Sequence, residues 1–419
     1  MAETAPAAPP TFVFDRYEDI REALFDATLS RTFDERSYAE GNIRDGVVSV
    51  SHGAVHRARR RVENTQFRSD VLRLYERELF PEVLTRLLDR LIDAPSVDVF
   101  AVGEQLSVVL AARRAGIDVD EGDLGQIREL VHYVDVFSQG SAILDAHDPE
   151  AVRALVYETY ETFERDWIRP SWERRAALIE RQRTGEIEVE DLPHDILTAL
   201  LSHRDDPQIE LSDTGRVTRE VATYLQGGTH TSAQTLVNAL DLIFAEGEAA
   251  DGIIARAAVD LAFCQRIVHE TLRLRPTTPK MRRRAVTATS VAETAIPAES
   301  TVILDVVAGN RDPHLFGENP DAFDPDRNVD PSVARWGLSF GAGAHQCPGR
   351  SVGGGFPAPA HGDLGEDHVF GLVALEIREI CRRGPNPDPE RPPERDLRTE
   401  RHTRWAHYWI RFEAWGRHS

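Results

Sequence analysis

The sequence has few cysteines and no long apolar run. Its three cysteines, Cys264, Cys347 and Cys381, are an odd number spread widely along 419 residues. This pattern does not suit a disulfide framework and favours a reducing, cytoplasmic location. No stretch approaches the roughly 18 consecutive apolar residues of a transmembrane helix, so no membrane span is expected. A net charge of −21 argues against a general nucleic-acid binder, because neutralising phosphates requires an excess of Lys and Arg.

The composition suits one large folded domain, with 41% hydrophobic and 28% charged residues. The Ala/Pro-rich residues 1–11 are expected to form a disordered tail before a single domain over residues 12–419. Strand signals are short, with the clearest at 301–307 and weaker ones at 12–14 and 405–412. Helical periodicity dominates the rest and predicts a mainly α fold, with helices near 17–29, 56 onward, 72–92, 124–136, 149–183, 195–201, 216–246 and 256–274.

A glycine-rich loop surrounds one of the cysteines. It reads Phe340-Gly341-Ala342-Gly343-Ala344-His345-Gln346-Cys347-Pro348-Gly349. Glycines allow positive φ and close backbone approach. Amide groups turned toward the sulfur would stabilise a thiolate, as a metal-bound cysteine requires. A lone buried cysteine in such a turn is more commonly inert, so composition alone leaves both interpretations open.

The whole string resembles the heme-binding loop F-G-x-G-x-H-x-C-x-G of the cytochromes P450, and most of the chain resembles the soluble bacterial type. The resemblance implies a triangular helical prism with small peripheral β-sheets that binds heme b. Cys347 would be the axial iron ligand, with Phe340, Gly341 and Gly349 shaping the loop around it. His345 would bind a heme propionate.

Further motifs of the same family occur elsewhere in the chain. Glu270 and Arg273 form an E-x-x-R pair, which alone would suggest only a solvated surface bridge. The resemblance adds Arg327 as the third member of a buried network that holds the cysteine loop.

The basic residues would bind the heme propionates, although solvated surface charge is the alternative for each. His56 and Arg60 match the family's H-x-x-x-R element and share one helix face. Arg283 is the best match to the family's second propionate-binding arginine, and Arg282 is the next best match.

The helix over 216–246 carries the string Gly227-Gly228-Thr229-His230-Thr231-Ser232. It resembles the oxygen-activation motif of the family, in which small residues let the helix lie over the heme and border the substrate. Thr231 would take the place of the catalytic alcohol. His230 stands where Asp or Glu is usual, and it either relays protons or merely fills a helix face.

Two regions depart from the family pattern. The helix after the cysteine loop is interrupted, and residues 353–367 are expected to be an insertion or a remodelled helix start. The segment before His56 is short, so the first helix of the family is expected to be missing or trimmed. Residues 30–54 and 131–144 are expected to border the substrate pocket.

The resemblance implies a monooxygenase that inserts one atom of O2 into a small or medium apolar organic substrate, as part of bacterial secondary metabolism. Electrons would come from NAD(P)H through a ferredoxin and its reductase. One alternative is the same fold with atypical chemistry, such as oxidative coupling, desaturation or peroxide-driven oxidation. A non-catalytic heme-binding protein is a further alternative, which the intact alcohol at Thr231 disfavours.

Overall fold

The computed structural model of the chain describes residues 9–31, 42–92, 94–211, 213–358, 364–398 and 404–412. Most of the predicted N-terminal tail lies outside these ranges, and strand β1 already begins at Thr11. Of the predicted pocket segment 30–54, residues 32–41 also lie outside the described part. Within the described residues, no helix combines the length and the apolar character needed to cross a membrane.

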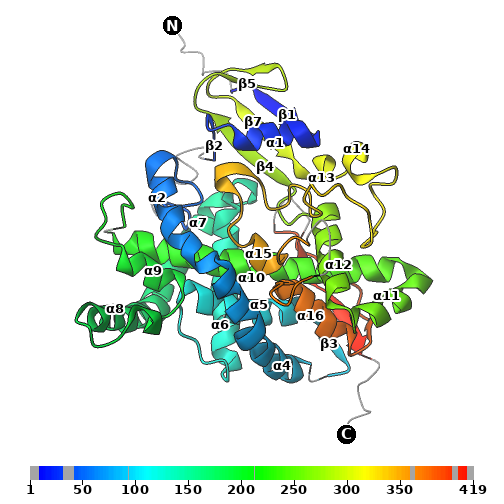
Figure 1. The fold of residues 1–419 in the computed structure, drawn as a ribbon, viewed down its shortest axis with the longest axis horizontal. Helices are drawn as coiled ribbons and strands as arrows, with labels where there is room; N and C mark the ends of the chain where they lie inside the picture. Colours follow the sequence, from blue (N-terminus) through cyan, green and yellow to red (C-terminus); the bar gives the residue numbers. More distant parts are fainter. Residues whose placement is uncertain are drawn as a thin grey trace.

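Helices form most of the structure, which confirms the predicted mainly α fold (Figure 1). Their bounds are α1 (Tyr17–Phe25), α2 (Gly53–Glu63), α3 (Ser69–Leu74), α4 (Phe80–Leu91), α5 (Val99–Ala115), α6 (Leu124–Ser141), α7 (Pro149–Phe163), α8 (Arg169–Arg183), α9 (Ile196–Ser202), α10 (Thr214–Ala245), α11 (Ala250–Ala257), α12 (Leu261–Leu274), α13 (Val306–Gly309), α14 (Pro313–Phe316), α15 (Arg350–Gly353) and α16 (Leu372–Cys381).

Small sheets lie at the edge of the helical body. The strands are β1 (Thr11–Phe14), β2 (Leu29–Ser30), β3 (Ser96–Asp98), β4 (Lys280–Ala285), β5 (Thr289–Val291), β6 (Thr294–Ile296), β7 (Thr301–Asp305), β8 (Pro385–Pro387), β9 (Glu394–Arg395), β10 (Trp405–His407) and β11 (Trp409–Phe412). The largest sheet has the order β1-β7-β4-β2, and β1 pairs parallel to β7. A second sheet, β3-β11-β8, and the pair β9–β10 bring the C-terminal strands onto the helices.

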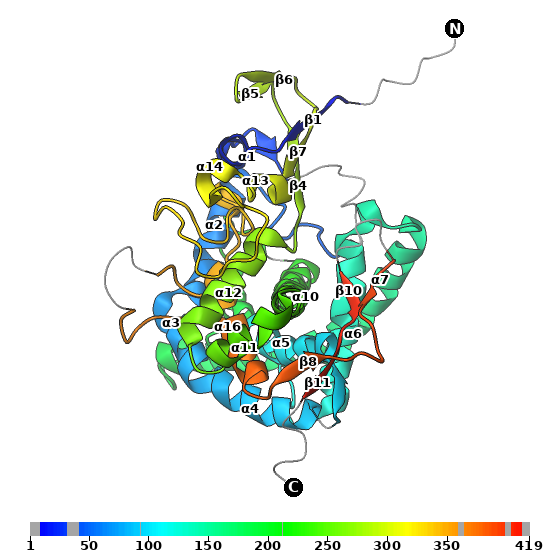
Figure 2. The ribbon, with the colours of Figure 1, turned by 90° about the vertical axis from the view of Figure 1, so that its right-hand side faces the viewer.

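Helix α10 runs through the centre of the molecule, and Figure 2 shows it nearly end-on among α5, α6, α12 and α16. Its N-terminus is capped by Asp213, whose side chain accepts a hydrogen bond from the Gly215 amide. Helix α5 packs closely along it, and Ala111 lies so near Gly228 that a Cβ there would be 3.0 Å away. Residue 228 must therefore stay small for the two helices to meet.

Sequence periodicity missed α5 and misplaced one helix boundary. Nearly every face of α5 is buried, so its sequence lacks the apolar stripe that identifies a surface helix. The helix predicted over 256–274 is two helices, α11 and α12. Asp260 separates them, because its side chain accepts a hydrogen bond from the Phe263 amide and so starts a new helix.

Candidate active site

The loop before α15 is a tight turn around Cys347. The Cys347 amide donates to the Phe340 carbonyl at 2.9 Å, which closes the turn over Gly341 and Gly343. Both glycines have positive φ, +65° and +67°. A Cβ on Gly343 would lie 2.5 Å from the Leu24 carbonyl oxygen. The glycines are therefore required both by the turn and by its contact with α1.

Two opposing influences act on the pKa of the Cys347 thiol, which are its burial and the polar groups around the sulfur. Burial raises the pKa of the thiol. A hydrogen bond involving the Gly349 backbone and the charge of Arg60 act in the other direction. Arg60 also donates to the carbonyl of Gln346 at 2.8 Å, so it holds the loop beside the sulfur. These groups suit a thiolate that ligates a metal.

Histidine and arginine side chains from three elements gather near the loop. The ring centroids of His56 and His345 are 4.2 Å apart, and His52 lies 5.1 Å from His345. Burial, followed by the charge of Arg60, lowers the pKa of His56 to about 4. Burial lowers the pKa of Arg283, on β4, to about 9. The structure thus brings together the residues that the sequence predicted to bind propionates.

These residues fit the carboxylates of a heme. The Nδ1 atom of His345 is buried without a hydrogen-bond partner among the described residues. Arg283 is 6% exposed and donates to the carbonyl of Arg282, yet the described part of the chain offers it no carboxylate within ion-pair distance. Buried cations require an anionic partner, and two propionates would supply it. Arg282 itself pairs with Asp145 at 3.1 Å, so the geometry favours Arg283.

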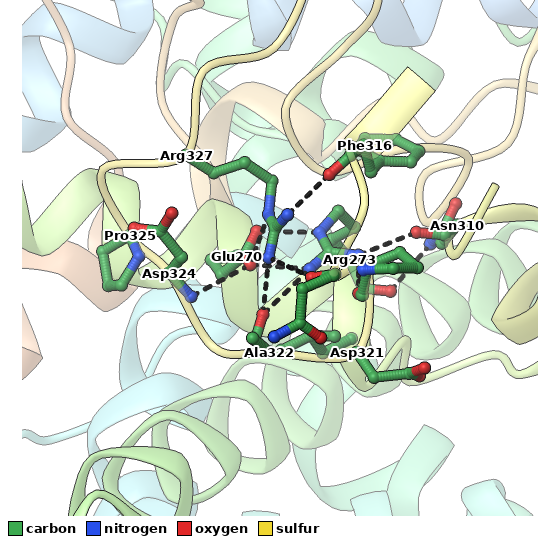
Figure 3. A network of polar contacts seen from close by, with 12 residues as sticks. Glu270, Arg273, Asn310, Phe316, Asp321, Ala322, Asp324, Pro325 and Arg327 are labelled. Atoms are coloured by element: carbon green, nitrogen blue, oxygen red, sulfur yellow. Dashed lines mark hydrogen bonds and ion pairs between the residues drawn. The ribbon is translucent and has the colours of Figure 1, made fainter. Parts of the chain in front are cut away.

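Glu270, Arg273 and Arg327 form a buried network (Figure 3). Arg273 donates to both carboxylate oxygens of Glu270, at 2.8 and 2.6 Å. Arg327 donates to the same carboxylate at 3.0 Å. The two guanidinium groups also donate to carbonyls of the irregular segment that leads to the cysteine loop, those of Asn310, Phe316, Asn319, Pro320 and Ala322. One carboxylate therefore fixes two arginines that together hold this segment on α12.

On α10, Gly227 and Thr231 lie one turn apart on the same face. A Cβ added to Gly227 would meet no atom within 4 Å. The Thr231 side chain donates to the Gly227 carbonyl at 2.7 Å, so α10 remains a continuous helix here. Thr231 is exposed, as an alcohol that acts on a bound molecule must be. Gly228 packs on α5 instead, so of the glycine pair only Gly227 faces open space.

His230 points away from this open face and into a cluster of charged groups. It is 8% exposed, and its Nδ1 lies 2.8 Å from Oε1 of Glu104 on α5. An Nη2 atom of Arg404, next to β10, lies 3.3 Å from Nδ1 and 3.1 Å from Nε2. Sequence analysis missed Glu104 and Arg404, because α5 gave no periodic signal and Arg404 follows no motif.

The helix after the cysteine loop is interrupted, as the glycines predicted. Helix α15 ends at Gly353 and α16 begins only at Leu372. The two ends of the segment between α15 and α16 lie side by side, because the Phe356 amide donates to the Val369 carbonyl at 2.7 Å. Gln265 and His269 of α12 both contact the Gly354 carbonyl, at 3.0 and 2.7 Å. Residues 359–363 of the predicted insertion lie outside the described part.

Comparison with known proteins identifies one family. The family model described as "Cytochrome P450" matches residues 6–354. A putative cytochrome P450 137 of Mycobacterium tuberculosis is 30% identical over 159 residues, which cover 37% of this chain and 33% of that one. An erythromycin C-12 hydroxylase of Saccharopolyspora erythraea is 42% identical over 93 residues, 22% of each chain. These alignments therefore span about a third or less of the curated relatives.

Solved structures cover almost the whole chain. The structure of HmtT, described as involved in himastatin biosynthesis, has a TM-score of 0.72 and 22% identity. The match covers 98% of this chain and 95% of that one. At this level of identity the match establishes the shared fold.

Proposed function

Because the chain belongs to the cytochrome P450 family, we propose that it is a heme-thiolate monooxygenase. It inserts one oxygen atom from O2 into a small or medium apolar organic substrate, in the cytoplasm. The observation that carries the proposal is the pairing of a thiol held in a closed turn with a cluster of histidines and the buried Arg283 guanidinium. A heme would require both features, one for its iron and one for its propionates.

The chain's own residues would hold the heme at several points. Cys347 would ligate the iron, and His56, Arg283 and His345 would bind the propionates. Arg60 would keep the loop in place through the Gln346 carbonyl. When bound, heme with a thiolate ligand supplies the oxidising chemistry that cleaves the O–O bond. The Glu270 network would keep this loop rigid.

Thr231 is the proposed catalytic alcohol, since it is exposed on the face that Gly227 leaves open. Its hydroxyl would deliver a proton on the open face of α10, and His230, the next residue back along the helix, is the second group proposed for proton delivery. The hydroxyl now bonds to the Gly227 carbonyl, so it must rotate away to act.

Electrons would come from NAD(P)H through a ferredoxin and its reductase, as is common in the family. The similarity to proteins described by erythromycin hydroxylation and himastatin biosynthesis supports a role in bacterial secondary metabolism.

The test combines isotope-labelled dioxygen with a ligand screen. Compounds that shift the heme Soret band would be incubated with NADPH, a plant-type ferredoxin and ferredoxin reductase. We expect one labelled oxygen atom in the product. A turned-over substrate without labelled oxygen would favour the alternative, which is the same fold with coupling or desaturation chemistry. The interruption of the helix after the cysteine loop, between Gly353 and Leu372, supports this alternative. Heme binding without turnover of any bound compound would indicate a non-catalytic protein.

A further inference from the structure

Two carboxyl groups with no role in the proposed function are buried where α2 meets α10. Glu63, the last residue of α2, and Glu220, in the first half of α10, are each 0% exposed. The Tyr224 hydroxyl donates to Oε2 of Glu63 at 2.7 Å, and the Val48 amide donates to Oε2 of Glu220 at 2.7 Å. The Oε1 atom of each carboxyl group is buried without a hydrogen-bond partner among the described residues.

Positive charge balances only one of the two groups. The Nη1 atom of Arg59, which is itself 1% exposed, lies 3.7 Å from Oε2 of Glu220. Within the described part of the chain, no Lys, Arg or His nitrogen lies within ion-pair distance of Glu63. A carboxylate that is fully buried without a counter-charge is strongly disfavoured, and such a group takes up a proton instead. The arrangement therefore suits one negative charge and one proton on the pair.

The same arginine and Glu220 hold the segment that precedes α2. The Arg59 guanidinium donates to three carbonyl groups, those of Gly46, Ile209 and Glu210. Together with the bond from the Val48 amide to Glu220, these contacts fix residues 46–48 against α10. The segment then leads to His52, whose ring centroid lies 5.1 Å from that of His345 in the candidate propionate site.

We propose that Glu63 and Glu220 share one proton in the folded protein, and that loss of this proton at alkaline pH is a switch that releases residues 46–48 from α10. With the proton, the pair carries one negative charge, which Arg59 balances. When the proton is lost to solvent, two carboxylates occupy one buried site with a single arginine. Glu63 then competes for the guanidinium with Glu220 and with the Gly46 carbonyl, so the contacts that hold the segment weaken. This switch does not depend on the proposed function.

The electrostatics of the pair support a shared proton. Burial, followed by the charge of Glu220, raises the pKa of Glu63 well above its ordinary value of 4.5, and the hydrogen bond from Tyr224 lowers it. Burial raises the pKa of Glu220 against the opposing charge of Arg59. The other charged groups facing this cluster are Arg60 of α2, Arg114 of α5, Glu210 and Arg216 of α10.

The raised pKa values set the sign of the effect on stability. Above pH 4.5 the folded pair keeps a proton that the unfolded chain has lost. The free energy of unfolding contributed by the pair should therefore fall as the pH rises from 4.5 toward the raised pKa of Glu63.

Infrared difference spectroscopy tests the shared proton itself. The C=O band of a protonated carboxylic acid is distinct from the bands of carboxylates. We expect the difference spectrum of wild type minus Glu63→Gln to contain this band at pH 7 and to lose it as the pH is raised. Glu376→Gln is the matched control, because Glu376 on α16 is also 0% exposed and burial raises its pKa to about 8. This control should keep the band of the pair, and a difference spectrum without the band at pH 7 would overturn the proposal.

Hydrogen–deuterium exchange of a peptide covering residues 42–52 tests the release. Rates are corrected for the intrinsic pH dependence of exchange, measured on the unfolded chain. We expect protection in the wild type and in Glu376→Gln to fall by about tenfold per pH unit above the transition. Protection in Glu63→Gln should stay level, because glutamine cannot ionise. Constant protection in the wild type, or the same loss in Glu63→Gln, would overturn the switch.

Tyr224→Phe gives a second test that does not need Glu63→Gln to fold. It removes the hydrogen bond that favours the ionised form of Glu63, so the loss of protection should move to higher pH. An unmoved transition would show that the proton is not held by this pair.

The effect of the switch on the candidate propionate site rests on the proposed function. In the heme-loaded protein, heme transfer to apomyoglobin should accelerate with pH more in the wild type than in Glu63→Gln. Equal pH dependence in the two proteins would overturn the link to the heme. If the wild type binds no heme, the proposed function fails instead, and the exchange result still decides the switch.

Discussion

Replacing Glu270 by Gln should strongly destabilise the protein, although only one carboxylate oxygen is exchanged for an amide nitrogen. The Glu270 carboxylate accepts hydrogen bonds from Arg273, from Arg327 at 3.0 Å and from the Asp324 amide at 3.1 Å. Glutamine offers one oxygen and turns an N–H group toward guanidinium donors. Both arginines are then buried without a counter-charge.

The magnitude follows from burial. Glu270 is 4% exposed, Arg273 0% and Arg327 8%. Breaking a buried ion pair from one side costs about 3–5 kcal/mol, a large part of a typical stability of about 5–15 kcal/mol. Asp326→Asn is the matched control, because Asp326 is the sequence neighbour of Arg327. It pairs with Arg256 at 2.6 Å, but both side chains of this pair are about half exposed. Its expected cost is about 0–1 kcal/mol.

Urea unfolding followed by circular dichroism, and by the Soret band in parallel, measures both effects. We expect Glu270→Gln to lower the unfolding midpoint strongly and to release heme first, since the network holds the segment before the cysteine loop. Equal losses in Glu270→Gln and Asp326→Asn would refute the reasoning that burial sets the energy of this network.

Three further predictions follow from the site. Thr231→Ala should divert NADPH electrons from product to hydrogen peroxide by about tenfold or more, as measured by peroxide release per NADPH; unchanged coupling would contradict its role as the alcohol. Arg283→Leu should speed heme transfer to apomyoglobin by about tenfold, whereas Arg284→Leu, a neighbour on the same strand that pairs with Glu299, should not; equal rates would contradict propionate binding by Arg283. Burial lowers the pKa of His269 from its ordinary value of 6.5 to about 4 in the folded protein. Between pH 6.5 and 4 the unfolded chain therefore binds a proton that the folded protein does not, so the free energy of unfolding should fall as the pH drops through this range. His269→Gln should flatten this dependence in urea melts at several pH values, and an unchanged slope would show that another group controls it.

The parts of the site that could be predicted from sequence are those carried by local strings. The cysteine loop, the Glu270–Arg273 pair and the Gly227–Thr231 segment each occupy a few consecutive residues, so each could be matched to a family motif although its residues alone left other interpretations open. Arg327 could be placed only by the family pattern, because 53 residues lie between it and Arg273 and no local rule describes that spacing.

The partners of His230 could not be predicted, and the reason is physical. Glu104 lies on a helix buried on almost every face, which hides its periodicity. Arg404 reaches the cluster only because Trp405 docks on α10, donating from its amide to Gln234 and from its indole to Asn238. Such contacts depend on tertiary packing between segments more than a hundred residues apart.

The central claim is that the Cys347 thiolate ligates a heme iron. The most direct test is the absorption spectrum of the reduced, CO-bound protein, compared between the wild type and Cys347→Ser, with Cys381→Ser as a buried-cysteine control. We predict the red-shifted thiolate-type Soret band in the wild type and in Cys381→Ser, and its loss in Cys347→Ser. A Cys347→Ser protein that keeps this band would contradict the account.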